Sequence, residues 1–219
     1  MKVFIGWSGN TSEKIASILK SWLPLLNEHI EPGVSVDMER GAAWRDSLSQ
    51  MISSCDGALF CVTEENVNST WLHYEAGAVS GQDKFVIPVL FDTSARVLGP
   101  LGQFQSLTLR KDDMRRLAYD LNNRCEKYAV SPEVLDTRFE VFYPTIESML
   151  EEVRNSRERD VERAQEYYKQ ALALRQQTTG SQMARESLKR DFETLNSKLD
   201  AILSQISKVS SGNIGGKAE

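Results

Sequence analysis

Gly57-Ala58-Leu59-Phe60-Cys61-Val62 is a run of six small or apolar residues, and a polar loop at residues 63–68 follows it directly. Successive side chains of a strand point to opposite faces of its sheet, so this run predicts a strand that is buried on both faces. Such strands occur where helices cover both sides of a parallel sheet. The run therefore predicts an α/β fold with the sheet in the middle.

The segments on either side continue this alternation of strand and helix. Short apolar runs predict four more strands, and apolar residues at helical spacing predict the helices between them. The expected strands are residues 2–6, 34–36, 84–90 and 106–109, and the expected helices are residues 13–26, 44–53, 71–79 and 112–125. Parallel pairing through right-handed crossovers would join them into one doubly wound, five-stranded sheet.

Four positions in this pattern predict local features. Ser12 is expected to cap the first helix, and Pro32-Gly33 to form a turn before the second strand. Pro88 is expected to place its end of the fourth strand at an edge or a bulge, because proline cannot donate a hydrogen bond to a neighbouring strand. Gly77 is expected to let its helix pack closely.

The chain changes character after residue 130. Residues 131–209 are charged and predict a helical extension, with Pro144 between two helical stretches. Further on, apolar residues step by four and three as in a coiled coil: Leu188, Phe192, Leu195, Leu199, Ile202 and Ile206. This seam is compatible with a hairpin that packs on residues 1–130 and equally with helices that self-associate. Residues 210–219 are rich in Ser and Gly and are expected to be disordered.

The composition argues against several classes of protein. A net charge of -5 argues against a nucleic-acid binder, which needs a basic face. No run approaches the roughly 20 apolar residues that span a membrane, and the start of the chain carries no signal-peptide pattern. The three cysteines show no metal-ligand spacing and fit a reducing cytoplasm: Cys55, Cys61 and Cys125. Neither a metal nor a bound cofactor is expected.

Trp71-Leu72-His73-Tyr74-Glu75 is the stretch that most clearly suggests a chemically active site. Ser69 is placed to cap the helix, and Trp71 and Glu75, four residues apart, lie on one helical face. An indole ring beside a carboxylate removes water from it, which raises its pKa. The alternative interpretation makes Trp71 a core residue and Glu75 a solvated surface residue.

The loops after the expected strands supply further candidate residues. In a doubly wound sheet, ligands bind outside the carboxyl ends of the strands, so these loops and Glu75 are expected around one crevice. Ser8, Gly9 and Arg40 could line this crevice. Gly9 would allow a phosphate or ribose to approach the backbone, and Arg40 could form a charge pair. An ordinary turn and a solvated arginine are the alternatives for these residues. Trp44 could line a ligand or belong to the core, as could Trp71.

These residues resemble motifs of the bacterial TIR (Toll/interleukin-1 receptor) domain, over about the first 130 residues. Residues 3–9 (VFIGWSG) resemble the family's first-strand box, and residues 37–44, with Arg40, resemble its BB loop and the next helix. Residues 53–66 (SSCDGALFCVTEEN) resemble the third strand and its loop. Residues 69–78 match the helix with the W-x-x-x-E signature. Trp7 stands where the family often has a tyrosine, so the ring is kept without its hydroxyl and has at most a stacking or wall role.

The resemblance implies a flavodoxin-like fold and, as in many bacterial members, cleavage of NAD+ at the nicotinamide–ribose bond. Glu75 would be the catalytic carboxylate, and NAD+ the substrate rather than a cofactor. The implied substrate-binding residues are Trp7, Ser8, Gly9, Asp37, Arg40, Trp44 and Trp71. The family's enzymes usually self-assemble, so partners would include further copies, through the TIR domain and the C-terminal helices. The resemblance also implies a role in anti-phage defence, either as a glycohydrolase with a linear product or as a cyclase with a cyclic ADP-ribose product, and a downstream effector that senses the product.

Two other functions stay open on the sequence. A TIR domain that only docks onto other TIR domains would need no catalysis. A nucleoside deoxyribosyltransferase is another flavodoxin-like enzyme with a glutamate at a sugar carbon. No glycine-rich phosphate-binding or dinucleotide-binding motif follows any expected strand.

Overall fold

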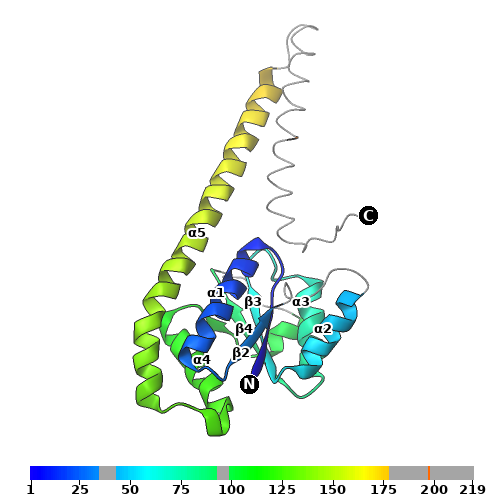
Figure 1. Ribbon diagram of the computed structural model, residues 1–219. Coiled ribbons are helices and arrows are strands. Elements are labelled where there is room, and N and C mark those ends of the chain that lie inside the picture. Colours follow the sequence, from blue (N-terminus) through cyan, green and yellow to red (C-terminus); the bar gives the residue numbers. More distant parts are fainter. Residues whose placement is uncertain (35–42, 93–98, 178–196, 198–219) are drawn as a thin grey trace.

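A parallel sheet forms the centre of the protein (Figure 1). The computed structural model describes residues 1–34, 43–92, 99–177 and 197. Within them the strands are β1 (Lys2–Gly6), β2 (Glu31–Val34), β3 (Gly57–Val62), β4 (Phe85–Leu90) and β5 (Leu107–Thr108). All pair in parallel, in the flavodoxin-like order β2-β1-β3-β4-β5. The predicted fold class is confirmed.

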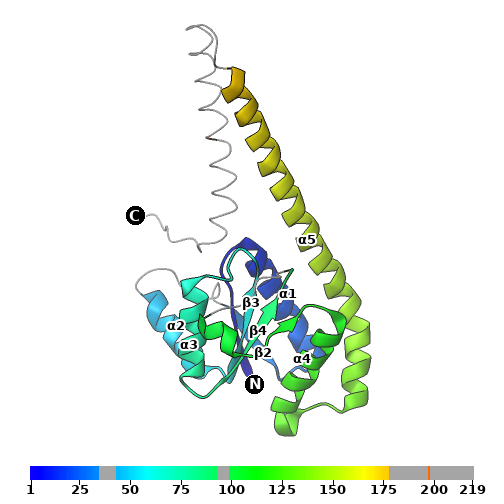
Figure 2. The same ribbon diagram turned by 180° about the vertical axis from the view of Figure 1, so that it is seen from behind.

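Helices cover both faces of this sheet, as the apolar run of β3 predicts. Helices α1 (Asn10–Leu26), α4 (Lys111–Arg124) and α5 (Pro132–Gln177) lie on one face, and α2 (Ala43–Ser54) and α3 (Thr70–Ser80) on the other (Figures 1 and 2). Along β3, Leu59 and Cys61 join the core under α1, whereas Ala58, Phe60 and Val62 join the core under α3. Two short 3-10 turns, η2 (Gly99–Gln103) and η3 (Glu126–Tyr128), complete the described elements.

The second strand lies earlier in the chain than predicted. Pro32 and Gly33, expected as a turn, are paired with Val3 and Phe4 inside β2, while residues 35 and 36 lie outside the described part. Glu31 donates its N–H to the Met1 carbonyl, so by strand alternation the nitrogen of Pro32 points away from β1, toward the free edge. An edge strand loses no hydrogen bond to a proline on that side.

The fourth strand corrects the expectation for Pro88. β4 runs between β3 and β5, and Pro88 pairs with Phe60 in register. Phe91 donates its N–H to the Val62 carbonyl, so the nitrogen of Pro88 points toward the β5 side. β5 pairs only with Val89 and Leu90, one residue further on. Pro88 therefore occupies an inner strand without costing the sheet a hydrogen bond.

Two local expectations for helices are also wrong. Helix α1 begins at Asn10 after Gly9, and Ser12 lies inside its first turn. Gly9 has φ 94°, a conformation that favours glycine. In α3, a Cβ built on Gly77 would meet no atom within 4 Å, so Gly77 permits no close contact there. By contrast, the Ser69 hydroxyl accepts a hydrogen bond from the Leu72 N–H and caps α3 as predicted.

Helix α5 is continuous through Pro144, contrary to the expected interruption. Proline removes the hydrogen bond to the carbonyl four residues earlier, that of Glu140. Both Pro144 and Glu140 are exposed, so water can donate a hydrogen bond to the Glu140 carbonyl. The helix is also held from its other face by six buried residues, namely Leu135, Phe139, Tyr143, Ile146, Leu150 and Val153.

The beginning of α5 shares the core of the α/β layers. The Phe139 ring meets Trp22 of α1 edge-on at 5.9 Å between centroids and stacks on Tyr143 at 5.1 Å. Further along, α5 extends past the sheet and away from it (Figure 2). The predicted seam at 188–206 and the predicted disordered tail at 210–219 lie outside the described residues, and the predicted boundary at residue 130 stays a prediction. No helix in the described ranges is long and apolar enough to cross a membrane.

Candidate functional site

Glu75 is buried near the carboxyl end of β1, on the α2/α3 face of the sheet. Its side chain is 1% exposed, and α3 presents it one turn after Trp71. Trp71 donates a hydrogen bond from its indole Nε1 to Glu75 Oε1 at 2.8 Å. The expected pairing of these two side chains is therefore present. The other oxygen, Oε2, is buried and finds no hydrogen-bond partner among the described residues.

Gly6 is the part of β1 nearest this free oxygen. A Cβ built on Gly6 would lie 3.1 Å from Glu75 Oε2 and 2.5 Å from the ring of Phe60. Any side chain at this position would therefore collide with the buried ring and crowd the carboxylate. Gly6 was not among the residues predicted for the site. The sequence feature that could have indicated Gly6 is a glycine at the last position of an apolar strand.

The carboxyl group of Glu75 is set to hold a proton near neutral pH. Burial raises the pKa of Glu75 to about 8, against the smaller lowering effect of the Trp71 hydrogen bond. The direction matches the expectation from the indole ring. Removal of water by the surrounding core has this effect because the charged form loses most from burial. A cation beside Oε2 would shift the equilibrium toward the carboxylate.

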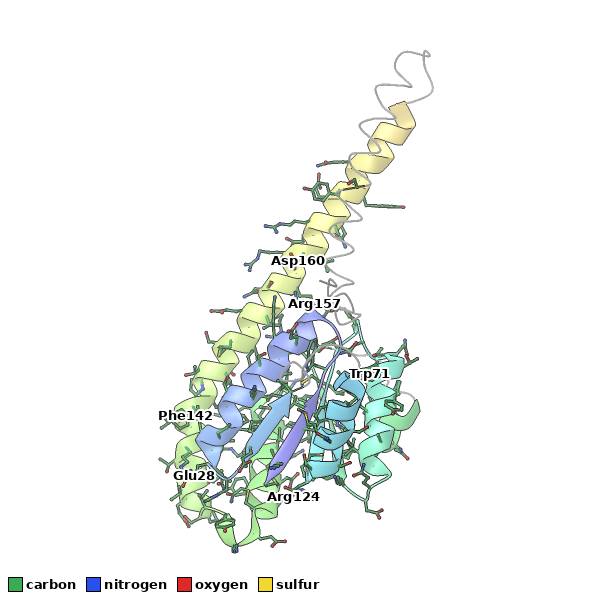
Figure 3. The ribbon with its side chains drawn as sticks, turned by 45° about the vertical axis from the view of Figure 1, so that its right-hand side comes forward. Glu28, Trp71, Arg124, Phe142, Arg157 and Asp160 are labelled. Carbon is green, nitrogen blue, oxygen red and sulfur yellow. The ribbon has the colours of Figure 1, made fainter. Side chains whose placement is uncertain are left out.

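Trp71 is half-buried at the border of the core rather than within it. It packs against the α2/α3 core cluster and lies 5.5 Å from the exposed ring of Tyr74. Figure 3 shows it at the end of α3 that is nearest the carboxyl ends of the strands. One part of the ring packs in the core cluster while Nε1 holds Glu75, and the ligand-lining role of Trp71 stays a prediction.

The β1–α1 connection contains the predicted residues Trp7, Ser8 and Gly9. Trp7 packs against the core on the α1 face, opposite to the face that carries Glu75, and its buried Nε1 finds no partner in the described part of the chain. Ser8 is buried, and its N–H donates to Ser12 Oγ at 3.0 Å. Ser12 Oγ donates in turn to the Ser8 carbonyl at 2.7 Å. The turn is thus fixed by Ser12, which the sequence suggested only as a cap.

Asn66 joins this turn to the loop after β3. Its side-chain Nδ2 donates to the Ser8 carbonyl at 2.9 Å and to the Cys61 carbonyl at 3.0 Å, and its Oδ1 accepts from the Thr63 N–H at 2.7 Å. Asn66 is buried with every one of its side-chain polar atoms bonded. It was not predicted from the sequence because an asparagine in a polar loop is ordinary, and only the fold shows that its amide reaches the loop after β1.

The remaining predicted site residues cannot be placed with these. Asp37 and Arg40 lie outside the described residues, and so does the side chain of Trp44, whose backbone lies in the first turn of α2. The structure therefore brings together Glu75, Trp71 and Gly6, with Ser8 at the neighbouring loop. In the described part of the chain no group of three His, Cys, Asp or Glu side chains could hold a metal ion. The three cysteines are buried free thiols.

Comparison with known proteins identifies the family. A family model described as a TIR domain matches residues 3–121, more than half of the chain. Among solved structures, one similar chain belongs to the TIR domains of the activated Roq1 resistosome that recognises the pathogen effector XopQ. It is 16% identical with a TM-score of 0.35, over 70% of this chain and 83% of that one. The search of curated proteins finds no match. With the five-stranded parallel sheet and the W-x-x-x-E helix in place, this chain belongs to the TIR domain family.

Proposed function

We propose that this protein cleaves NAD+ at the bond between nicotinamide and ribose, with Glu75 as the catalytic carboxylate. The observation that carries the proposal is the state of the Glu75 side chain. One oxygen is held by Trp71 at 2.8 Å, and the other is buried without a partner among the described residues, beside the backbone of Gly6. A buried carboxyl oxygen without a partner is costly to maintain, and such groups concentrate at functional sites.

The chemistry needs one acidic group. Nicotinamide carries a positive charge while it is bound to ribose and leaves as a neutral base, so its departure requires no general acid. The ribose it leaves resembles an oxocarbenium ion, which a nearby carboxylate stabilises. Glu75 Oε2 would face this charge or a ribose hydroxyl, while the Trp71 hydrogen bond keeps Oε1 in place.

Substrate would also change the charge of this group. With a pKa of about 8, Glu75 is mostly protonated at neutral pH in the absence of substrate. The cationic nicotinamide ring would favour the ionised form, so binding would release a proton. The group would then carry its charge only when a positive reaction centre is present to use it.

Access to Glu75 points to an assembled active form. At 1% exposure, the carboxyl group cannot contact a substrate in the single chain without some rearrangement near it. Self-association, expected through the TIR domain and the C-terminal helices, would supply that rearrangement. Asp37, Arg40 and Trp44 would then complete the substrate site together with Ser8 and Gly9, whereas Trp7 packs on the opposite face of the sheet. A cyclic ADP-ribose product, an effector that senses it, a cytoplasmic location and an anti-phage role belong to this same proposal.

The same burial favours a second candidate function. A carboxyl group covered this completely could serve only to fix Trp71 and the start of α3, in a TIR domain that docks onto other TIR domains. Such a module would turn over no NAD+ at any protein concentration. It would lose binding when residues 37–43 are changed.

Release of nicotinamide from NAD+ by the purified full chain tests the proposal. We expect turnover that rises more steeply than in proportion to protein concentration. Glu75→Gln keeps the shape of the side chain and should lower the rate at least about 100-fold. Glu158→Gln, at an exposed position of α5, is the matched control and should behave as the wild type.

Other outcomes have distinct meanings. Full activity in Glu75→Gln would remove Glu75 from the catalytic role. A wild type that is inactive at every concentration would leave docking onto other TIR domains as the remaining function. Base exchange on deoxynucleosides with indifference to NAD+ would point to a deoxyribosyltransferase.

A further inference from the structure

Two arginines of α5 contact the loops at the carboxyl ends of the middle strands. Arg154 binds Asp92, directly after β4, through Nε at 2.6 Å and Nη2 at 3.1 Å. Arg157 binds two residues after β3, with Nη2 at 2.8 Å from Glu64 Oε2 and Nε at 3.2 Å from Glu65 Oε1. The same Glu65 oxygen accepts a hydrogen bond from Thr11 Oγ1 of α1 at 3.3 Å. Helix α5 thus holds the edge of the sheet at which Glu75 lies.

The residues held by Arg157 begin the segment that leads to Glu75. Asn66 follows Glu65 directly and is bonded to the Ser8 carbonyl, and its own carbonyl accepts from the Ser69 N–H at 2.8 Å. Ser69 caps α3, and the His73 N–H, in the next turn, donates to the Ser69 carbonyl at 3.2 Å. Residues 63–69 therefore form a bonded connection from Glu64 and Glu65 to the first turn of α3. That turn carries Trp71, whose Nε1 holds Glu75.

These ion pairs are not what attaches α5 to the domain. The apolar residues of α5 from Leu135 to Val153 already bury that attachment in the main core. Arg157 is 21% exposed and Glu64 is 51% exposed, and pairs this open to water contribute little to global stability. Glu65, however, has a buried Oε2 without a partner in the described residues, and its Oε1 is paired with Arg157. Without Arg157, Glu65 would be expected to move toward water.

We infer that Arg157 is a positioning residue for Glu75, acting through residues 63–69 at the start of α3. The catalytic consequence of this inference rests on the proposed function. The positioning of α3 by Arg157 rests only on the contacts described above. Figure 3 shows Arg157 beside the start of α1, and Asp160 one turn further along as α5 leaves the α/β layers. The part of α5 that extends from the domain is therefore connected to the candidate site through Arg157. A partner bound to the extended part can act on the site through this connection.

Amide hydrogen exchange on the full chain tests the link without using activity. In Arg157→Ala, amides of residues 63–75 should exchange several-fold faster than in the wild type. Arg157→Lys keeps the charge but cannot reach both carboxylates as the guanidinium does, so it should give an intermediate rate. The control is Arg159→Ala, on the same helix, exposed and in no ion pair with a described residue, and it should leave the exchange unchanged. Unchanged exchange in Arg157→Ala would overturn the inference.

The kinetics of NAD+ cleavage provide the second readout. Arg157 touches no substrate in this arrangement, so Arg157→Ala should lower kcat about tenfold or more and leave KM unchanged, with partial recovery in Arg157→Lys. An active wild type with an unchanged kcat in Arg157→Ala would overturn the positioning role even if exchange increases. If the wild type does not cleave NAD+, the proposed function fails, and the exchange data alone decide whether Arg157 holds the segment.

Discussion

At the scale of single residues, two neighbours define the environment of Glu75. Gly6 leaves room for Oε2 because it has no side chain, and Trp71 supplies the one hydrogen bond that the carboxyl group makes in the described structure. The W-x-x-x-E spacing predicts the second of these from helical geometry alone. The first depends on the distance between β1 and α3, which no local pattern contains.

The raised pKa of Glu75 predicts how stability changes with pH. Because the pKa rises from 4.5 to about 8 on folding, the folded state holds a proton that the unfolded state releases in this range. The stabilising contribution is therefore complete below about pH 4.5 and is lost as the pH rises through about 8. Glu75→Gln lacks this loss. Relative to the wild type, its free energy of unfolding should improve by a few kcal/mol between about pH 4.5 and about pH 9.

Urea denaturation at a series of pH values measures this difference. The comparison with the wild type removes the titration of all other groups, since these are common to both proteins. A difference that does not change with pH would mean that Glu75 keeps an ordinary pKa in the folded protein. The burial argument for its charge state would then be wrong.

Gly6 provides a second prediction at this scale. Gly6→Ala places a methyl group 2.5 Å from the Phe60 ring, which is fully buried and cannot turn away. Overpacking of this kind costs about 1–3 kcal/mol in the free energy of unfolding. Gly77→Ala is the matched control, because its methyl group meets nothing within 4 Å and the helix should gain about 0.5–1 kcal/mol. Equal stability of Gly6→Ala and the wild type would contradict the close approach.

At the scale of elements, two prolines and one helix show how context overrides local rules. Pro32 and Pro88 both sit in strands because their nitrogens point to a side where the sheet has no bond to lose. Pro144 sits inside α5 because that face of the helix is open to water. The expectations of a turn, an edge and a break each follow from a sound physical rule. In each case the direction in which one backbone group points decides that the proline is tolerated.

Phe139 tests the attachment of α5 to the sheet layers. It is fully buried between Trp22 and Tyr143, so Phe139→Ala should lower the free energy of unfolding by about 3–5 kcal/mol. Val141→Ala, two residues away and 62% exposed, should change it by no more than about 0.5 kcal/mol. Denaturant unfolding of both variants gives the comparison. A small effect at Phe139 would mean that α5 packs only loosely on α1.

At the scale of the whole molecule, α5 belongs to two parts of the protein. Its first part, as far as Val153, completes the core that α1 and α4 begin, and its second part extends away from the sheet (Figure 1). The position of Arg157, where these parts meet, makes the helix a connection between the candidate site and whatever binds its extended end. A cut at the predicted boundary, residue 130, would separate α5 from the core that it covers.

Shortened chains test that boundary. Residues 1–130 should unfold without cooperativity or aggregate, because the removal of α5 exposes the core around Trp22 and Leu19. Residues 1–159 keep the residues of α5 that join this core and should give a cooperative thermal transition. Circular dichroism melts of both chains are sufficient. A sharp transition in residues 1–130, at the temperature of the longer chain, would support the boundary as predicted.

The sequence by itself determined the features that depend on short-range geometry. The two-sided burial of β3, the Ser69 cap and the Trp71–Glu75 contact each involve residues within a few positions of one another, where strand and helix periods fix the relation. Only the tertiary structure decided that Gly6 borders Oε2, that Asn66 ties two loops together and that α5 completes the core. These contacts join parts of the chain that are distant in sequence. Their partners are chosen by packing across the sheet, which no local period encodes.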